Sequence, residues 1–401
     1  MSTIRNSGPI ACYSGATKDN DIQRKSSSGG LFYAFAERAV RTGGVAVGAA
    51  FEEDGSVSLQ CAHTTEELVR LMGSKYVQSK SNGIYRIVAE KLKTGVDVVF
   101  CATPCQCNAL LRFLGGKHPD NLLILDFICH GVPSESSWYH YLNYRAKGSR
   151  ITDISFRDKR INWGNFGTRL LFDNGTEYFQ KHQDDPYMRL FLANRTLRPA
   201  CHRCRAKGAN RSSDITLGDH WGVADSEKTR SGCSVLIVNT ELGREKLSEL
   251  SGKLDISPIS YEEAVRNNTN YFNSVGIPFN RHRVLKRLEQ RADCVFDHPE
   301  RMIATSFAEK AIRRAIRIGR NLLSKYGACS EKCYFKLMQA DKHRSFESRA
   351  ACCGCGACNA VCPTGAIAME LDREGFRYPV IDESKCCHCN KCIAVCEKKP
   401  I

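Results

Sequence analysis

Apolar runs and amphipathic segments alternate along the first 150 residues. Three short apolar runs are typical of buried strands: VAVGAAF at 45–51, VDVVFC at 96–101 and LLILDFI at 122–128. Helical spacing or helix-start signals occur at 31–41, 64–71, 83–93, 106–114 and 135–146. Strands separated by helices indicate βαβ units, so the pattern predicts an α/β core built on a sheet.

Beyond residue 150 the predicted strands become shorter and pair locally. They lie at 154–157, 168–172, 176–180, 215–217 and 235–239, with helices at 185–194 and 241–250. Asp173-Asn174-Gly175 joins two of these strands and is a strong hairpin signal. We interpret residues 1–299 as one α/β unit with a mixed sheet and an antiparallel, α+β elaboration.

Residues 300–351 are predicted to form a basic helical connector. An amphipathic helix at 307–325 places four arginines beside an apolar stripe that includes Ile312 and Ile316. Such a helix either packs on the core through its apolar stripe or docks on an acidic partner or a lipid surface. A cysteine-dense module follows at 352–401.

The composition limits the class of protein. The chain has 401 residues, 42% of them hydrophobic and 25% charged, which is enough for a large apolar core without disulfides. We find no apolar run of membrane-spanning length and no signal-peptide pattern, so we expect a cytoplasmic protein. Thiols stay reduced there, so the 22 cysteines indicate metal binding or catalysis rather than a disulfide scaffold.

The formal net charge of +15 is unevenly distributed. The connector alone carries 12 Lys and Arg against 5 Asp and Glu, whereas the last fifty residues are balanced at 6 against 6. No nucleic-acid fold signature accompanies the charge, so we expect no nucleic-acid partner.

The last fifty residues contain a repeated cysteine pattern. Each copy reads C-x2-C-x2-C-x3-C, and the module resembles a bacterial-type 2×4Fe-4S ferredoxin, which implies a small βαβ-like fold and two clusters. In such ferredoxins the fourth cysteine of each run binds the other cluster. The resemblance therefore implies one ligand set of Cys352, Cys355, Cys358 and Cys396, and a second of Cys386, Cys389, Cys392 and Cys362.

Two features of this module depart from the simplest pattern. Glu397 stands where the repeat would have proline, but proline is not a ligand. Cys353 and Cys387 are extra thiols inside the two loops. The alternative is a pair of zinc sites, although zinc prefers CxxC knuckles separated by a spacer.

Four further cysteines are candidates for another cluster. Cys105 and Cys129 each follow a predicted strand, and parallel neighbouring strands would bring both to the sheet edge where α/β folds bind ligands. Cys201-x2-Cys204 adds two thiols. The alternative is a set of buried reduced cysteines with a zinc-type CxxC, and spacing alone leaves both open. Cys101 and Cys107 are rivals of Cys105, although Cys101 lies in the apolar strand and is interpreted as core.

Three glycine-containing segments are candidates for a flavin or nucleotide site: KSSSGG at 25–30, GSKYVQS at 73–79 and GDHWG at 218–222. The first precedes a predicted helix, whose free N–H groups stabilise a diphosphate. An ordinary N-cap with a flexible loop is the simpler interpretation of this segment. There is no G-x-G-x-x-G fingerprint and no P-loop, so a flavin would bind in a non-Rossmann mode.

The motifs KSSSGG, GSKYVQS, ATPCQ, ICHGVP, CHRC and SDITLGDHWG, in this order, resemble the beta subunit of coenzyme F420-dependent hydrogenases and dehydrogenases. The resemblance covers about 22–299. It implies an FAD-binding iron–sulfur oxidoreductase with a third 4Fe-4S cluster on Cys105, Cys129, Cys201 and Cys204. The implied FAD contacts are Lys25, Ser26, Ser27, Ser28, Gly29, Gly30, Ser74, Lys75, Tyr76, Gln78, Asp219 and Trp221.

We therefore expect electrons to pass from an external low-potential donor, such as a ferredoxin or hydrogenase-like subunit, through the clusters to FAD and a two-electron acceptor. The acceptor is coenzyme F420 or another small organic molecule. The alternative is an electron-transfer adaptor that serves a partner oxidoreductase and has no substrate of its own. His130 and His220 are the polar groups nearest the expected site, and an ordinary structural role is the simpler interpretation of each. Catalytic residues, the oligomeric state and the role of Cys329 and Cys333 are not predicted.

Overall fold

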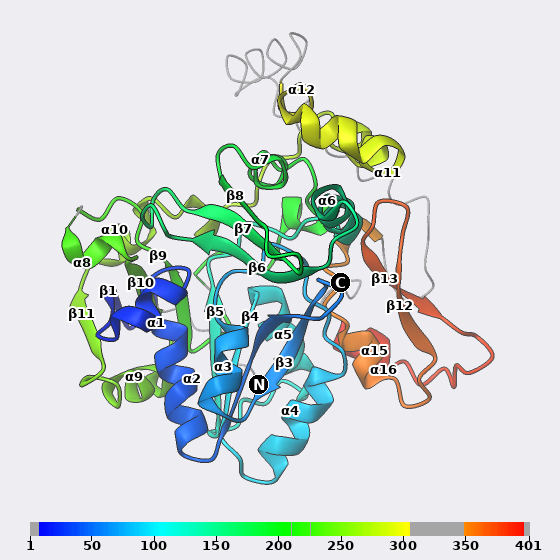
Figure 1. The fold of residues 1–401 in the computed structure, drawn as a ribbon. Coiled ribbons are helices and arrows are strands. Elements are labelled where there is room, and N and C mark those ends of the chain that lie inside the picture. The colour runs from blue at the N-terminus through cyan, green and yellow to red at the C-terminus, as the bar shows by residue number, and fades with distance from the viewer. Residues whose placement is uncertain (1–7, 210, 225, 305–348, 397–401) are drawn as a thin grey trace, which may run out of the picture.

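A mixed eight-stranded sheet forms the centre of the computed structural model, which describes residues 8–304 and 349–396 apart from 210 and 225 (Figure 1). Its strand order is β11-β1-β10-β9-β5-β4-β2-β3. The strands are β1 Ala11–Thr17, β2 Val45–Phe51, β3 Val57–Ala62, β4 Val98–Ala102, β5 Leu122–Phe127, β9 Ile215–Asp219, β10 Ser234–Val238 and β11 Leu254–Pro258. Strands β2, β4, β5 and β9 run parallel, and the other pairings are antiparallel.

Helices cover both faces of this sheet, because successive side chains of a strand point to opposite faces. In β2, Val45 and Val47 pack with α4 and α5, whereas Ala46 and Ala50 pack with α2 and α3. The helices of the first half are α1 Asn20–Lys25, α2 Leu31–Arg41, α3 Thr65–Leu71, α4 Ile84–Lys93, α5 Pro104–Phe113 and α6 Glu135–Ala146. Those of the second half are α7 Pro186–Leu192, α8 Glu227–Arg230, α9 Glu241–Ser248, α10 Tyr261–Arg266, α11 Arg281–Asp297 and α12 Pro299–Ile303, with short 3-10 turns at η1 Pro199–Arg203, η2 Thr269–Tyr271 and η3 Arg349–Ala351.

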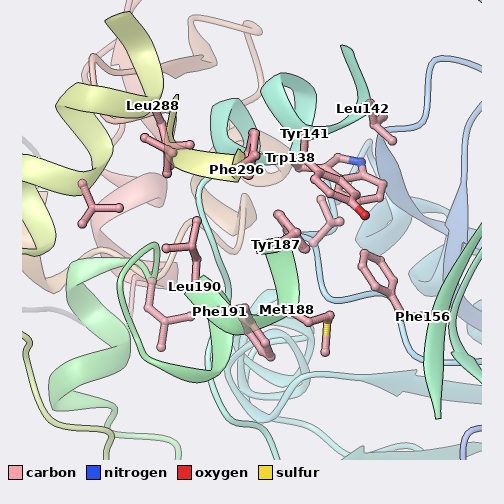
Figure 2. Packing of buried hydrophobic residues seen from close by; sticks show 14 of the residues in the cluster. Trp138, Tyr141, Leu142, Phe156, Tyr187, Met188, Leu190, Phe191, Leu288 and Phe296 are labelled. Atoms are coloured by element: carbon pink, nitrogen blue, oxygen red, sulfur yellow. The ribbon is translucent and has the colours of Figure 1, made fainter. Parts of the chain in front are cut away.

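A second, antiparallel sheet lies over one end of the first (Figure 1). It consists of β6 Ile151–Asp158, β7 Gly167–Phe172 and β8 Glu177–Lys181. An aromatic cluster joins it to α6, α7 and α11, as Figure 2 shows for Trp138, Phe156, Tyr187 and Phe296. Trp138 lies 5.1 Å from Phe156 and 5.0 Å from Tyr187 between ring centroids, so these rings form one closely packed core.

The mixed α/β core and the local hairpin agree with the sequence pattern. Strand β2 and helix α6 have the expected bounds, and β7 and β8 pair across the Asp173–Gly175 turn. Strands β1, β3 and β11 were not expected: β1 contains no continuous apolar run, and β3 and β11 alternate apolar and polar residues over only six and five positions. The helix expected at 307–325 lies outside the described residues, as do Cys329 and Cys333.

The cysteine-dense module forms helices α15 Ala357–Val361 and α16 Lys391–Val395 around a hairpin of β12 Ile367–Leu371 and β13 Arg377–Ile381. The expected small module of strands and helices is present, and the described order of its elements is α–β–β–α rather than βαβ. The reason is local: the Asp372 carboxylate accepts hydrogen bonds from the backbone N–H groups of Glu374 and Phe376, which closes a tight turn between the strands.

The module packs directly on the core beside α4 and α5 (Figure 1). Ala357, Cys358 and Ile367 belong to the same apolar cluster as the residues of β4 and β5. Polar contacts add to this packing. Arg281, which is 1% exposed, pairs with Glu374 at 2.8 Å, and burial would raise the pKa of Glu374 but Arg281 and His282 hold it below its usual range.

Within the described residues, no helix combines the length and the apolar character needed to cross a bilayer.

Candidate functional site

A cavity of about 530 Å³ opens at the carboxyl ends of the parallel strands β4, β5 and β9. This is the position at which open α/β sheets bind ligands, and the volume is typical of a ligand site. Segments far apart in the sequence line it: the loop before α2, the segment at 71–79, the ends of β4 and β5, the η1 turn and the tail loop at 353–355.

The four core cysteines all line this cavity. Cys105 lies in the first turn of α5, directly after β4, and Cys129 follows β5. Cys201 lies in η1 and Cys204 follows it. Because β4 and β5 are parallel neighbours, as expected, their ends bring Cys105 and Cys129 to one sheet edge, and η1 adds the other two thiols.

Burial and neighbouring thiols raise the pKa values of the core cysteines. Burial, followed by the neighbouring Cys129, raises the pKa of Cys201 to about 12, and burial raises the pKa of Cys129 to about 11. Because thiol ligands must be deprotonated, binding of iron at these cysteines would release their protons.

Donors around the thiols fit an anionic cluster. The backbone N–H of Val132 donates to the Cys201 Sγ at 3.4 Å, and the Thr103 Oγ1 lies 3.2 Å from the Cys105 Sγ. The Lys207 ammonium donates to the Cys129 carbonyl at 2.8 Å and places a positive charge beside the thiols. Hydrogen bonds and cations stabilise thiolate ligands, so this donor set suits a 4Fe-4S cluster.

The two rival cysteines differ in position. The Cys107 Sγ is buried 3.6 Å from the carbonyl oxygens of Ala102 and Leu125 and belongs to the apolar core. Cys101, interpreted as core from its strand, also lines the cavity, since its strand ends at the cavity wall. Cys105 is the one that occupies the first turn of the following helix.

Ten of the twelve residues expected to contact FAD line the same cavity: Ser26, Ser27, Ser28, Gly30, Ser74, Lys75, Tyr76, Gln78, Asp219 and Trp221. Lys25 ends α1 and Gly29 packs against β1, so neither is part of the lining. Helix α2 begins after Gly30, whose φ is +80°, and no side chain caps it. Its first N–H groups are therefore available to an anion.

Arg157, in β6, was not singled out from the sequence, yet it joins three of the predicted segments. Its guanidinium donates to the Ser27 carbonyl at 2.9 Å, to the Tyr76 hydroxyl at 3.2 Å and to both carboxylate oxygens of Asp219. It lies 4.0 Å above the Phe166 ring. The residue is 6% exposed, and its Nε has no hydrogen-bond partner among the described atoms.

Basic side chains outnumber acidic ones in the cavity wall. The lining includes five cationic side chains, Lys75, Arg157, Arg205, Lys207 and Arg211, and one carboxylate, Asp219. Burial lowers the pKa of Lys75 to about 7. Trp221 stacks on Trp163 at 4.9 Å, so one face of its ring is already covered.

The two histidines have structural partners. The Asn270 amide donates to the His130 Nδ1 at 3.1 Å, so the His130 Nε2 carries the proton that it donates to Asn194 at 2.7 Å. Burial lowers the pKa of His130, which keeps it neutral in this role. His220 contacts Ser14 at 2.5 Å, and it is not part of the cavity lining.

The tail thiols separate into an inner and an outer group. Cys352, Cys355, Cys358 and Cys396 are near enough to influence one another electrostatically, which brings the fourth cysteine of the second run to the first run. Cys362 and Cys392 pack with Cys386 on the apolar cluster, whereas Cys389 is exposed. Glu383, Cys386 and His388 also lie together at the surface, with their ligand atoms within 4.8 Å of one another.

Comparisons with known proteins match both parts of the chain. Residues 96–262 match the family model for the C terminus of the coenzyme F420 hydrogenase/dehydrogenase beta subunit, and residues 351–399 match the 4Fe-4S dicluster domain. The first match contains the four core cysteines, Asp219 and Trp221, whereas the segments at 25–30 and 73–79 lie outside it. No curated protein matches the chain in sequence.

Among solved structures, the chain is similar to one chain of the F420-reducing NiFe hydrogenase complex from Methanosarcina barkeri, studied by xenon derivatization. The identity is 16% and the TM-score 0.47, over 71% of this chain and 94% of that one. The family matches identify iron–sulfur electron transfer of an oxidoreductase type. Residues 96–262 belong to the family defined by the C-terminal part of the coenzyme F420 hydrogenase/dehydrogenase beta subunit, and residues 351–399 belong to the 4Fe-4S dicluster domains.

Proposed function

We propose that the chain is an FAD-dependent iron–sulfur oxidoreductase, with a third 4Fe-4S cluster in the core, that transfers electrons from its ferredoxin-type module to a two-electron acceptor. The observation that carries this proposal is the shared cavity: the four core thiols and ten predicted flavin contacts line one space of about 530 Å³. A cluster exchanges single electrons, and bound FAD would supply the conversion to electron pairs.

The residues that line the cavity are suited to hold FAD. The uncapped start of α2 and the cationic lining would hold the diphosphate. Arg157 lines the cavity and holds the loops of Ser27 and Tyr76 at fixed positions. The Ser27 and Ser74 hydroxyls bind each other at 2.8 Å, which joins the two predicted loops directly.

The core thiols would hold the cluster, and the residues around them would stabilise its charge and keep the wall of the site in place. Lys207 and the Val132 N–H stabilise negative charge on sulfur. His130 fixes Asn194 and Asn270 in its neutral form, so the wall beside the thiols keeps its shape. Coenzyme F420 is the first acceptor to test, because the matching family is named for it.

The test is the cofactor content of the full-length protein purified without oxygen. We expect about one FAD and about 12 iron atoms per chain, the iron count of three 4Fe-4S clusters. Cys201→Ser should lower the iron to about eight, because it removes a core ligand. Cys107→Ser is the matched control, since Cys107 is buried in the apolar core, and should keep about 12.

About eight iron atoms and no flavin in the wild-type protein would contradict the proposal and favour the electron-transfer adaptor. The acceptor is tested by stopped-flow reoxidation of the dithionite-reduced protein with coenzyme F420, quinones and activated double bonds. Equal rates across this panel would mean that the cavity has no specific acceptor.

A further inference from the structure

Arg198 is a fully buried cation at the junction between the core and the tail module. The residue is 0% exposed, and each of its three side-chain nitrogens donates a hydrogen bond. The Nε donates to the Gln78 side-chain oxygen at 3.0 Å, the Nη1 to the Cys352 carbonyl at 3.0 Å and the Nη2 to the Arg377 carbonyl at 2.7 Å. Gln78 lines the cavity, whereas Cys352 and Arg377 belong to the module. The side chain therefore joins the cavity wall to the first cysteine loop and to strand β13.

The guanidinium lies directly against the backbone of that cysteine loop. A Cβ at Gly354 would lie 2.6 Å from the Arg198 Nη2 and 2.8 Å from its Cζ, so a side chain at position 354 would exclude the cation from its present place. The backbone of Arg198 also contacts the core cysteines, because its carbonyl accepts the Cys201 N–H at 3.0 Å. One residue thus contacts the loop of the inner tail cysteines and the turn that carries a core cysteine.

The charge of Arg198 has no carboxylate partner within the described parts of the chain. Its three acceptors are neutral oxygens. Two carboxylates that it influences electrostatically have other partners: Glu135 pairs with Arg377 at 3.0 Å, and Asp372 accepts backbone N–H groups of its own turn. The Tyr378 ring, whose centroid is 4.7 Å from the guanidinium carbon, adds a cation–π attraction. A buried charge without a counter-charge is costly, so this position calls for an anion.

A cluster on the inner tail cysteines would supply that negative charge. Iron binds cysteine as the thiolate, so a 4Fe-4S cluster with four such ligands is anionic. Cys352 is one of the ligands predicted for the inner set, and its carbonyl is an acceptor of Arg198. The reduced cluster is more negative than the oxidised one, so a nearby cation that is shielded from water stabilises the reduced form more and raises the reduction potential.

We propose that Arg198 is a positioning residue that provides the counter-charge of the inner tail cluster: it holds the cysteine loop against the cavity wall and raises the reduction potential of that cluster. The inference rests on the ferredoxin-type module of the proposed function and needs neither FAD nor the core cluster. Arg198 itself exchanges neither electrons nor protons.

The test is a redox titration of the full-length holoprotein, purified without oxygen and monitored by electron paramagnetic resonance, together with its iron content. Arg198→Met removes the charge at a similar side-chain volume. It should keep the wild-type iron content and shift the midpoint potential of one tail cluster to a lower value. Arg198→Lys keeps the charge, so it should keep the iron and shift the potential less.

Arg86→Met is the matched control. Arg86 also donates to a module carbonyl, that of Cys362 at 2.8 Å, but it is exposed, so water screens its charge. This variant should shift the potentials less than Arg198→Met does.

Four outcomes would overturn the inference. Wild-type potentials in Arg198→Met would show that the charge does not act on the tail clusters. Equal shifts in Arg198→Met and Arg198→Lys, or loss of iron in Arg198→Lys, would show that the shape of the guanidinium matters rather than its charge. An equal shift in Arg86→Met would show a general effect of cations near the module. Absence of flavin or of a core-cluster signal in the wild-type protein is a separate result, since it contradicts the proposed function and leaves the tail clusters to be titrated.

Discussion

Arg157 shows how one side chain organises the cavity wall. It is a buried cation, and it binds groups from the loop before α2, from the segment at 71–79 and from the end of β9. Burial disfavours a charge, but the Tyr76 and Asp219 groups compensate, so the pKa of Arg157 lies above its ordinary value. Removing this side chain leaves the partly buried Asp219 carboxylate without its partner.

We expect Arg157→Gln to destabilise the protein by about 3–5 kcal/mol, the range found when one partner of a buried ion pair is removed. It should also lower the FAD content. Denaturant unfolding and the flavin absorbance of the purified protein measure the two effects. Arg160→Gln is the matched control, because Arg160 lies three residues away but pairs with Asp158 and Glu177 at the surface, where ion pairs contribute little. Equal effects of the two substitutions would contradict this role.

The cysteines of this site can be predicted from the sequence, whereas Arg157 cannot. Cys201-x2-Cys204 is visible as a spacing, and Cys105 was found because it follows an apolar strand. Arg157 carries no such signal, since it is one of 58 Lys and Arg residues and follows an ordinary strand pattern. Its role arises only from contacts with Ser27 and Asp219, which are 130 and 62 positions away in the sequence.

The arrangement of whole elements in the tail module is likewise only partly predictable from the sequence. The repeat of cysteines predicts the module, but not that a turn at Asp372 places β12 and β13 side by side. The module also packs into the same apolar cluster as β4 and β5, which its own sequence does not reveal. Local patterns specify strands and turns, whereas the face on which an element docks depends on surfaces elsewhere in the chain.

Substitutions of two glycines in the module distinguish the effect of backbone strain from the effect of lost contact with the core. Gly354 and Gly365 have φ values of +68° and +66°, so an alanine is strained equally at both positions. A Cβ at Gly354 would lie 2.5 Å from the Gln78 Nε2 and 2.6 Å from the Arg198 Nη2, whereas a Cβ at Gly365 meets no atom within 4 Å.

Gly354→Ala is therefore expected to lower the melting temperature more than Gly365→Ala and to increase proteolysis between the core and the module. Differential scanning calorimetry and limited trypsin digestion of the holoprotein measure these effects. If both variants lose the same stability, the contact of the loop with Gln78 and Arg198 does not hold the module in place.

At the scale of the whole molecule, the proposed clusters connect segments that are distant in the sequence. The core ligands extend from Cys105 to Cys204, and the inner tail set joins Cys352 to Cys396. Metal binding that needs a folded site stabilises the fold by its own binding free energy.

We expect removal of iron by a chelator under anaerobic conditions to lower the melting temperature of the wild-type protein. The melting temperature of Cys201→Ser should fall by less on iron removal, since this variant lacks a core ligand and one of the three proposed sites is already missing. A wild-type melting temperature that does not change on iron removal would contradict this expectation.

The exposure of the tail thiols affects how the protein responds to dioxygen. Cys389 is exposed at the surface, whereas Cys358 is buried and the core thiols are partly buried in the wall of the cavity. Oxidative damage to iron–sulfur centres follows access, so dioxygen should destroy the outermost centre first. Under the proposed function, that loss would separate the core site from an external electron donor. Brief aeration would then stop the proposed electron entry before the cavity site is damaged.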